Sequence, residues 1–414
     1  MRSLLLVPLF CAGLCAADPP ASVSEGFIQA LARAPAINAA RARCLAAERA
    51  RWAAGVLPDP MVGVDVGQAR PRMGKDMTMY GAMVEQTLPR WGERDAMRQT
   101  AQAQESMALA EFAEVVGEHA AAVAAALAEV QAATETTALI GEARERVRAL
   151  GEIVRSRVAS GGAMIGDILS LDTRAQQLDL QMAESGRREA DAAAEVRGRL
   201  GLAVDASLPP PAWPDPAAIR PQATTSVHRA SAGRAEAEAM ERAATARGNP
   251  ETALGLIWER EAAGTVDELD TFRLSFKMSV PVWRGAYADA VDAAHGRVQA
   301  ASHEARAAAG MARSQIGRAQ RAAAQGARGQ ATAEAIAERS RTEYEAVIRQ
   351  VGTGAASLPT ALDLLDRITE ARMQAIEARL TGEMALAELW RLAPPALPAS
   401  EAAMASPHAG SATP

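Results

Sequence analysis

The sequence carries the same succession of landmarks twice, and this duplication restricts the fold more than any other feature. Residues 88–92 (LPRWG) are echoed by residues 280–285 (VPVWRG), with the paired prolines and tryptophans 192 positions apart. Landmarks that recur in the same order at one offset indicate structural duplicates. We expect a first repeat over 18–207 and a second over 222–394, joined by a proline-rich linker over 208–221.

Each repeat is predicted to run helix, strand pair, helix. The first helix is expected over 22–56, opening at a capping box of Ser22 and Glu25, and its counterpart over 222–247. Alternation of apolar and polar residues predicts the strands, which cover 61–69, 77–88, 253–261 and 272–282. Strands of about ten residues can cross a bilayer when tilted. A single pair of such strands would be interpreted as a soluble hairpin with one buried face. Two strand pairs, each beside very long helices, favour the interpretation as membrane strands.

The helices that follow the strands are predicted to be unusually long. Residues 92–158 would span about 100 Å as one helix. Apolar residues at spacings of three and four, such as Val147, Leu150 and Val154, indicate coiled-coil contact with neighbouring helices. The abundant alanine lets such helices approach closely.

The N-terminus has the pattern of an export signal. Residues 1–17 place one arginine before an apolar run that ends in small residues, which is typical of a secretory signal peptide. The alternative is that Cys15 becomes a lipidated N-terminal cysteine. Beyond the signal only Cys44 remains, so no internal disulfide can form. At the other end, the tail over 395–414 is expected to be disordered.

After the signal, no apolar run reaches the roughly 18 residues of a membrane helix, so any membrane crossing must use strands. Four strands cannot close a barrel, and an open edge in lipid would leave backbone groups without partners. Three copies would supply twelve strands. The predicted fold class is therefore mainly α with a β-barrel part: a trimeric, twelve-stranded outer-membrane barrel continued by a long periplasmic α-helical barrel.

The landmarks resemble those of the TolC-like outer-membrane efflux proteins. The resemblance rests on residues 57–60 (LPDP) before the first strand, 85–92 (EQTLPRWG) after the second and 280–283 (VPVW) after the fourth. It implies a homotrimer in outer-membrane lipid that extends into the periplasm. It also implies that cargo arrives from an inner-membrane RND-type pump through a periplasmic adaptor (membrane fusion protein). The stretch over 85–95 most resembles the heavy-metal branch, whose cargo would be copper and silver or zinc, cobalt and cadmium.

The resemblance also implies a periplasmic gate. In the family, carboxylates follow a Val-Gly-Thr turn; here residues 351–353 are followed by Asp363 and Asp366, after a loop over 354–360 that is longer than the family pattern. Threefold symmetry would gather six such carboxylates into a ring that attracts cations. Asp167 and Asp172 are weaker candidates. The alternative is that these aspartates only stabilise the positive end of a helix dipole.

Two further groups are candidates for contact with cargo. Arg273 and Lys277 alternate with the apolar residues of the fourth strand and are candidates for the barrel lumen. Thioethers bind soft Cu(I), so the methionines around the second strand are metal-ligand candidates, with gap-filling as the alternative: Met73, Met77, Met79 and Met83.

Other functions find little support. The histidines are isolated, and the sequence has no nucleophile elbow and no phosphate loop, so we expect no enzyme and no cofactor. Arginines are scattered among glutamates in a chain of net charge −6, which makes nucleic acid an unlikely partner. The alternative function is a soluble periplasmic coiled-coil adaptor or scaffold, although an adaptor should carry one helical hairpin rather than two.

Overall fold

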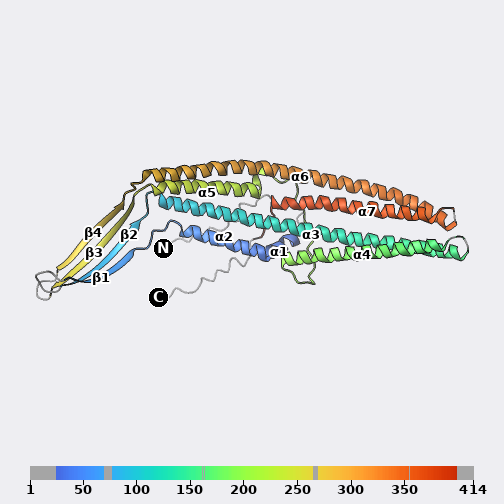
Figure 1. Ribbon diagram of the computed structural model, residues 1–414, viewed down its shortest axis with the longest axis horizontal. Helices are drawn as coiled ribbons and strands as arrows, with labels where there is room; N and C mark the ends of the chain where they lie inside the picture. The colour runs from blue at the N-terminus through green and yellow to red at the C-terminus, as the bar shows by residue number, and fades with distance from the viewer. Residues whose placement is uncertain are drawn as a thin grey trace. The chain divides into compact units, whose positions relative to one another are not determined.

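The computed structural model describes residues 25–69, 77–160, 162, 164–263, 269–353 and 355–398. The predictions for the signal peptide, Ser22, Cys15, Met73 and residues 399–414 of the tail lie outside these residues. Within them, the order helix, strand, strand, helix, helix occurs twice (Figure 1).

The first helix differs from its prediction because it is two helices. α1 spans Glu25–Arg33 and α2 spans Pro35–Ala53. Pro35 has no N–H to donate to the preceding turn, and it disfavours helical backbone at Ala34, so the chain restarts with proline at the first helical position. In the second repeat, a short 3-10 turn over Pro221–Ala223 (η1) precedes α5, which spans Thr225–Arg247.

The strands are β1 (Met61–Ala69), β2 (Met77–Leu88), β3 (Glu251–Ala263) and β4 (Leu269–Ser279). The first two have the expected bounds, and β3 is longer than expected at both ends. β4 begins and ends three residues earlier than the predicted 272–282. Its alternation continues into residues 280–282, but Pro281 cannot donate a ladder hydrogen bond, so the alternation there does not correspond to pairing.

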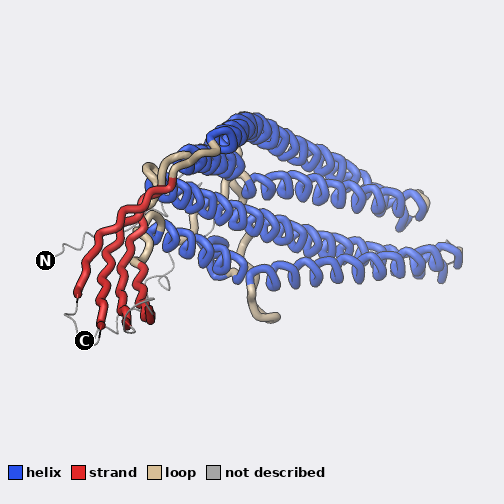
Figure 2. The backbone as a smooth tube through the Cα atoms, turned by 60° about the vertical axis from the view of Figure 1, so that its left-hand side comes forward, coloured by secondary structure: helices blue, strands red, loops and turns tan. Residues whose placement is uncertain are grey.

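The four strands form one antiparallel sheet in the order β1-β2-β3-β4, drawn in red in Figure 2. β2 pairs with β3, and so the central pairing joins the two repeats. Within the described residues, β1 and β4 each have a single neighbour. The sheet therefore keeps two open edges.

Long helices follow each strand pair. α3 spans Glu93–Ala159 and leads into α4 (Ile165–Leu200), while α6 spans Arg284–Thr353 and leads into α7 (Leu358–Ala387) and the 3-10 turn η2 (Glu388–Arg391). Each pair is an antiparallel helical hairpin (Figure 1). Among the described residues, no helix has the length and hydropathy required to cross a membrane.

The chain forms two compact units, and each combines segments of both repeats. Unit 1 comprises the described parts of Met1–Arg41, Glu111–Val227 and Ala309–Pro414, and unit 2 those of Ala42–Ala110 and His228–Ala308. Unit 2 thus contains the whole sheet, and unit 1 contains both helical hairpin ends.

Unit 1 is held together by buried residues from all four long helices. One cluster joins Leu150 of α3, Leu178 of α4, Val351 of α6 and Leu365 of α7, which are all buried. A second cluster includes α1, where Phe27 stacks on Trp390 with ring centroids 6.3 Å apart. The Trp390 indole N–H also donates to the carbonyl oxygen of Ala212 in the linker, at 3.1 Å. The interrepeat linker is therefore part of the core.

Candidate functional site

One face of the sheet in unit 2 is apolar and exposed. The strand register aligns Val62, Val84, Leu256 and Leu274 in one row across the four strands. Leu274 is 77% exposed, and contiguous exposed apolar residues mark sites that contact a protein or a membrane. The same face continues with further exposed apolar residues: Val64, Val66, Leu254, Phe272, Phe276 and Met278. A face of this composition suits contact with lipid.

The opposite face is polar and lined partly by very small residues. The register aligns Asp65 with Gly81 and Glu259, and Glu85 with Gly255 and Ser275. Polar and apolar side chains alternate most regularly along β4, as in a sheet with one face toward water and the other toward lipid.

Both predicted lumen residues lie on this polar face, and both form ion pairs. Lys277 Nζ lies 2.6 Å from Glu85 Oε2, and Arg273 Nη2 lies 3.1 Å from Glu259 Oε2. Glu85 is buried, with 8% of its surface exposed, and Lys277 reaches it from β4 across the narrow side chains of β3. The ion pairs of Lys277 and Arg273 both lie on this polar face, and a further pair, Arg260 with Asp270 at 3.8 Å, lies on the other face near the β3–β4 end of the sheet.

Two of the methionine candidates, Met79 and Met83, lie on the polar face of β2. Met83 lies opposite Gly63, where an added Cβ would be 3.4 Å from the Met83 Cε, so Met83 occupies the space beside that glycine. Met79 lies opposite Gly67 and is exposed. Nothing is described of Met73 or of the Met77 side chain. Among the described residues, no group of three or more histidine, cysteine or carboxylate side chains could hold a metal ion.

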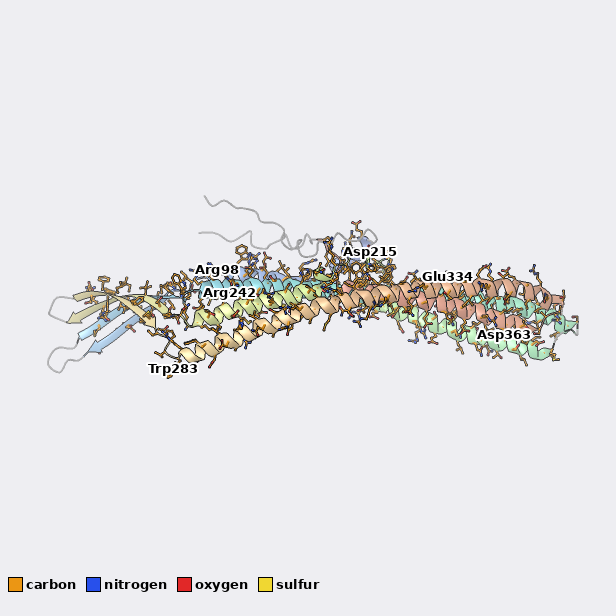
Figure 3. All side chains as sticks on the ribbon, turned by 90° about the horizontal axis from the view of Figure 1, so that it is seen from above. Arg98, Asp215, Arg242, Trp283, Glu334 and Asp363 are labelled. Carbon is orange, nitrogen blue, oxygen red and sulfur yellow. The ribbon has the colours of Figure 1, made fainter. Side chains whose placement is uncertain are left out.

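The predicted gate residues both lie on α7, near its start in unit 1. Asp363 is labelled in Figure 3. Asp363 is exposed, and Asp366 is partly buried. Asp366 forms an ion pair with Arg174 of α4, so its charge is compensated within the protomer. The pair connects the α3–α4 hairpin to the α6–α7 hairpin.

The connection before α7 is shorter than expected. α6 ends at Thr353 and α7 begins at Leu358, so residues 354–357 connect them rather than 354–360. The Ser357 hydroxyl accepts a hydrogen bond from the backbone N–H of Thr360, and proline is tolerated in a first helical turn. Asp363 and Asp366 therefore lie beyond the first turn, where the effect of the helix dipole has declined.

The weaker candidates have different environments. Asp167 lies in the first turn of α4, and its carboxylate accepts a hydrogen bond from the backbone N–H of Met164 at 3.1 Å. This is a helix cap, and it supports the dipole interpretation for this residue. Asp172 is exposed on the second turn of the same helix.

Sequence reasoning missed the arginines that connect the two hairpins. Besides Arg174, Arg157 of α3 donates to the backbone oxygen of Val351 at 2.9 Å. A signal was nevertheless present, because Arg174 and Asp366 are 192 positions apart, and so are Glu85 and Lys277. Opposite charges at equivalent positions of the two repeats therefore pair in both units.

Two ionisable side chains in unit 1 are perturbed by burial. Burial raises the pKa of Tyr344, although the charge of Arg146 opposes the shift, and the phenol oxygen has no hydrogen-bond partner in the described part of the chain. Burial also raises the pKa of Glu383, opposed by Arg379 and reinforced by Glu135. Neither group belongs to the predicted gate.

Part of the chain matches a known protein family, and its fold is similar to that of solved structures. Residues 28–200 match the family model of the outer membrane efflux proteins, whereas no curated protein sequence matches. The fold is similar to that of VceC, an outer membrane protein of Vibrio cholerae (15% identity, TM-score 0.74, 89% of this chain and 95% of that one). It is also similar to the open-state outer membrane channel MtrE of Neisseria gonorrhoeae (16%, 0.72, 88% and 87%) and to CusC (13%, 0.73, 87% and 90%).

A four-stranded amphipathic sheet and paired long helices are the parts that this chain shares with the fold of outer membrane channel proteins. Residues 28–200 thus match the outer membrane efflux protein family, and the fold of the chain is similar to that of outer membrane channels. This is a family of transport ducts rather than of enzymes.

Proposed function

We propose that the chain is one subunit of a homotrimeric exit duct in a tripartite efflux system. Cargo would pass passively after delivery by an inner-membrane RND-type pump and a periplasmic adaptor. The observation that carries this proposal is the sheet of unit 2, which has an exposed apolar face, a polar face and two open edges.

The open edges favour assembly in threes. Unpaired backbone groups of β1 and β4 would each cost several kcal/mol in lipid. Pairing β4 of one copy with β1 of the next satisfies both edges through a head-to-tail contact, and three copies close a barrel of twelve strands.

Cell fractionation and electrophoresis test this assembly. We expect the protein in the outer-membrane fraction, as an oligomer that resists dodecyl sulfate at room temperature and dissociates to monomers on boiling. A monomer in the periplasmic fraction would refute the proposal and would favour the adaptor alternative.

We further propose that Asp363 and Asp366 control the periplasmic opening. The exposed Asp363 supplies charge that attracts cations, while the ion pair between Asp366 and Arg174 keeps the two hairpins together. Replacing both aspartates with alanine should raise single-channel conductance and lower cation selectivity in planar bilayers. Asp205→Ala, which removes an exposed carboxylate in the segment after α4, is the control. Unchanged current and selectivity in the double variant would exclude this role.

For the cargo, we propose heavy-metal cations. The support is the resemblance of residues 85–95 to the heavy-metal branch, together with the thioethers of Met79 and Met83 on the polar face of β2. Deletion of the gene should lower tolerance to copper and silver or to zinc, cobalt and cadmium, and a plasmid copy should restore it. Unaltered tolerance to all five metals would rule out this cargo without affecting the duct.

A further inference from the structure

A basic pocket in unit 2 lies where the chain leaves α2 and approaches the sheet. Its volume is about 640 Å³, and it is formed by the end of α2, the segment that follows and the first turns of α3. The lining contains three guanidinium groups and no carboxylate; its charged and aromatic members are Arg51, Trp52, Arg94 and Arg98. Val56 and Leu57 add an apolar side.

The pocket is built by specific contacts. Gly55 has a φ of +70°, and a Cβ there would lie 3.0 Å from both the backbone oxygen of Arg94 and the Cγ of Arg98. Arg94 Nε donates to the carbonyl oxygen of Gly55 at 3.0 Å, and the Arg51 guanidinium lies over the Trp52 ring at 5.2 Å. The turn at Gly55 therefore brings the arginines of two helices to one cavity.

The nearby acids do not balance this charge. Glu105 pairs with Arg51 at 2.7 Å and Asp95 with Arg98 at 3.6 Å, and neither carboxylate lines the pocket. Three arginines against two carboxylates leave a positive site. Guanidinium groups bind phosphate oxygens by charge-assisted, often bidentate hydrogen bonds, so the chemistry favours a phosphate group.

The position of the pocket favours a phosphate at a membrane surface. Leu57 precedes β1 by a few residues, and β1 begins the lipid-suited face. Exposed tryptophans mark the same end of the sheet: Trp52 is 69% exposed before β1, Trp91 is 87% exposed after β2, and Trp283 follows β4 (Figure 3). Tryptophan is enriched where membrane proteins cross the interface between lipid and water.

We propose that this pocket binds the phosphate of an anionic phospholipid in the periplasmic leaflet of the outer membrane. The arginines hold the phosphate, while Val56, Leu57 and Trp52 contact the upper part of the acyl chains. The inference rests on the membrane location of the sheet and is independent of the cargo and of the gate.

Native mass spectrometry of the purified, detergent-solubilised oligomer tests the site. Retention of phosphatidylglycerol is compared with that of zwitterionic phosphatidylcholine. We expect a preference for phosphatidylglycerol that falls about tenfold in the Arg94→Gln/Arg98→Gln variant, which corresponds to about 1.4 kcal/mol, because charge-assisted contacts to the phosphate are lost. The matched control is Arg187→Gln/Arg188→Gln, which removes two exposed arginines that pair with acids of their own helix, α4.

Three outcomes would overturn the proposal: an unchanged preference in the pocket variant, an equal loss in the control, or complete displacement of the lipid by millimolar inorganic phosphate, which would identify a free-anion site. Electrophoresis checks that each variant assembles, because an assembled variant runs as an oligomer that dissociates on heating. If the double variant does not assemble, Arg98→Gln alone serves, since Arg98 pairs with the exposed Asp95 of its own helix. A preference equal to wild type would then refute the site.

Discussion

The ion pair between Lys277 and Glu85 is expected to stabilise the sheet because it compensates a buried carboxylate. Glu85 is 8% exposed, whereas the Lys277 side chain is 62% exposed. Lys277→Gln should destabilise the assembled protein by about 1–3 kcal/mol, since it leaves the carboxylate without its cation. Thermal dissociation of the oligomer measures the effect.

The double variant Lys277→Gln/Glu85→Gln provides the control for this prediction. It removes both charges, and its midpoint of dissociation should recover most of the loss. If the destabilisation of the double variant equalled the sum of the destabilisations of the two single variants, the two side chains would not act as a pair.

Glu383 should make the stability of unit 1 depend on pH. Burial raises its pKa in the folded chain, so the folded state holds this proton more tightly than the unfolded state. Stability from this group is present below the ordinary carboxyl pKa and is lost as pH rises through the raised value. Glu383→Gln should therefore raise the thermal midpoint, followed by circular dichroism, at pH 8 but not at pH 4. Equal midpoints at pH 8 would contradict this.

At the scale of single residues, sequence reasoning located one partner of each pair and not the contact. Asp366 was found through its place after a Val-Gly-Thr turn, but Arg174 lies in a helix with many other arginines. Arg174 and Asp366 occupy equivalent positions in the two repeats. This equivalence indicates a contact only once the two hairpins are known to pack together. Asp167 differs from the other candidates because its carboxylate caps α4. That contact with the backbone N–H of Met164 follows from the exact residue at which α4 begins.

The hairpin of α6 and α7 depends on a close approach at two glycines. A Cβ on Gly326 would lie 2.6 Å from the backbone oxygen of Ala378 and 2.9 Å from the Cα of Gly382. Gly326→Ala should therefore destabilise the protein by about 1–3 kcal/mol, because the backbones must separate. Chemical denaturation followed by circular dichroism measures the change.

Gly310, on the same helix, is the matched control. Nothing lies within 4 Å of a Cβ placed there, so Gly310→Ala should stabilise the helix by up to about 1 kcal/mol. If both alanine variants had the same stability, the close approach of the two helices would not be the cause.

At the scale of elements, periodicity predicted which segments are helix and strand, and local chemistry shifted their ends. The interruption at Ala34 and the early end of β4 both come from prolines whose missing N–H removes a backbone hydrogen bond. α7 begins two residues before the predicted end of the loop at residue 360, because Ser357 caps the helix. The pairing of β2 with β3 joins residues far apart in sequence, so no local pattern contained it.

For the whole molecule, the exposed apolar face should be needed for membrane insertion. Leu274→Arg places a cation on that face and should reduce the amount of heat-modifiable oligomer in the outer membrane. An arginine that faces lipid at mid-membrane destabilises a barrel by about 2–4 kcal/mol. Thr271→Arg, on the polar face of the same strand opposite Glu259, should assemble normally. Equal loss in both variants would argue against one lipid-facing side.

The central claim is that three copies of this chain enclose a continuous duct through the outer membrane. Single-channel recording of the purified oligomer in planar lipid bilayers tests it most directly. The account predicts discrete, uniform conductance steps whose size and cation selectivity change in the Asp363→Ala/Asp366→Ala variant. Protein that inserts as a stable oligomer yet never conducts, in the wild type and in that variant alike, would contradict it.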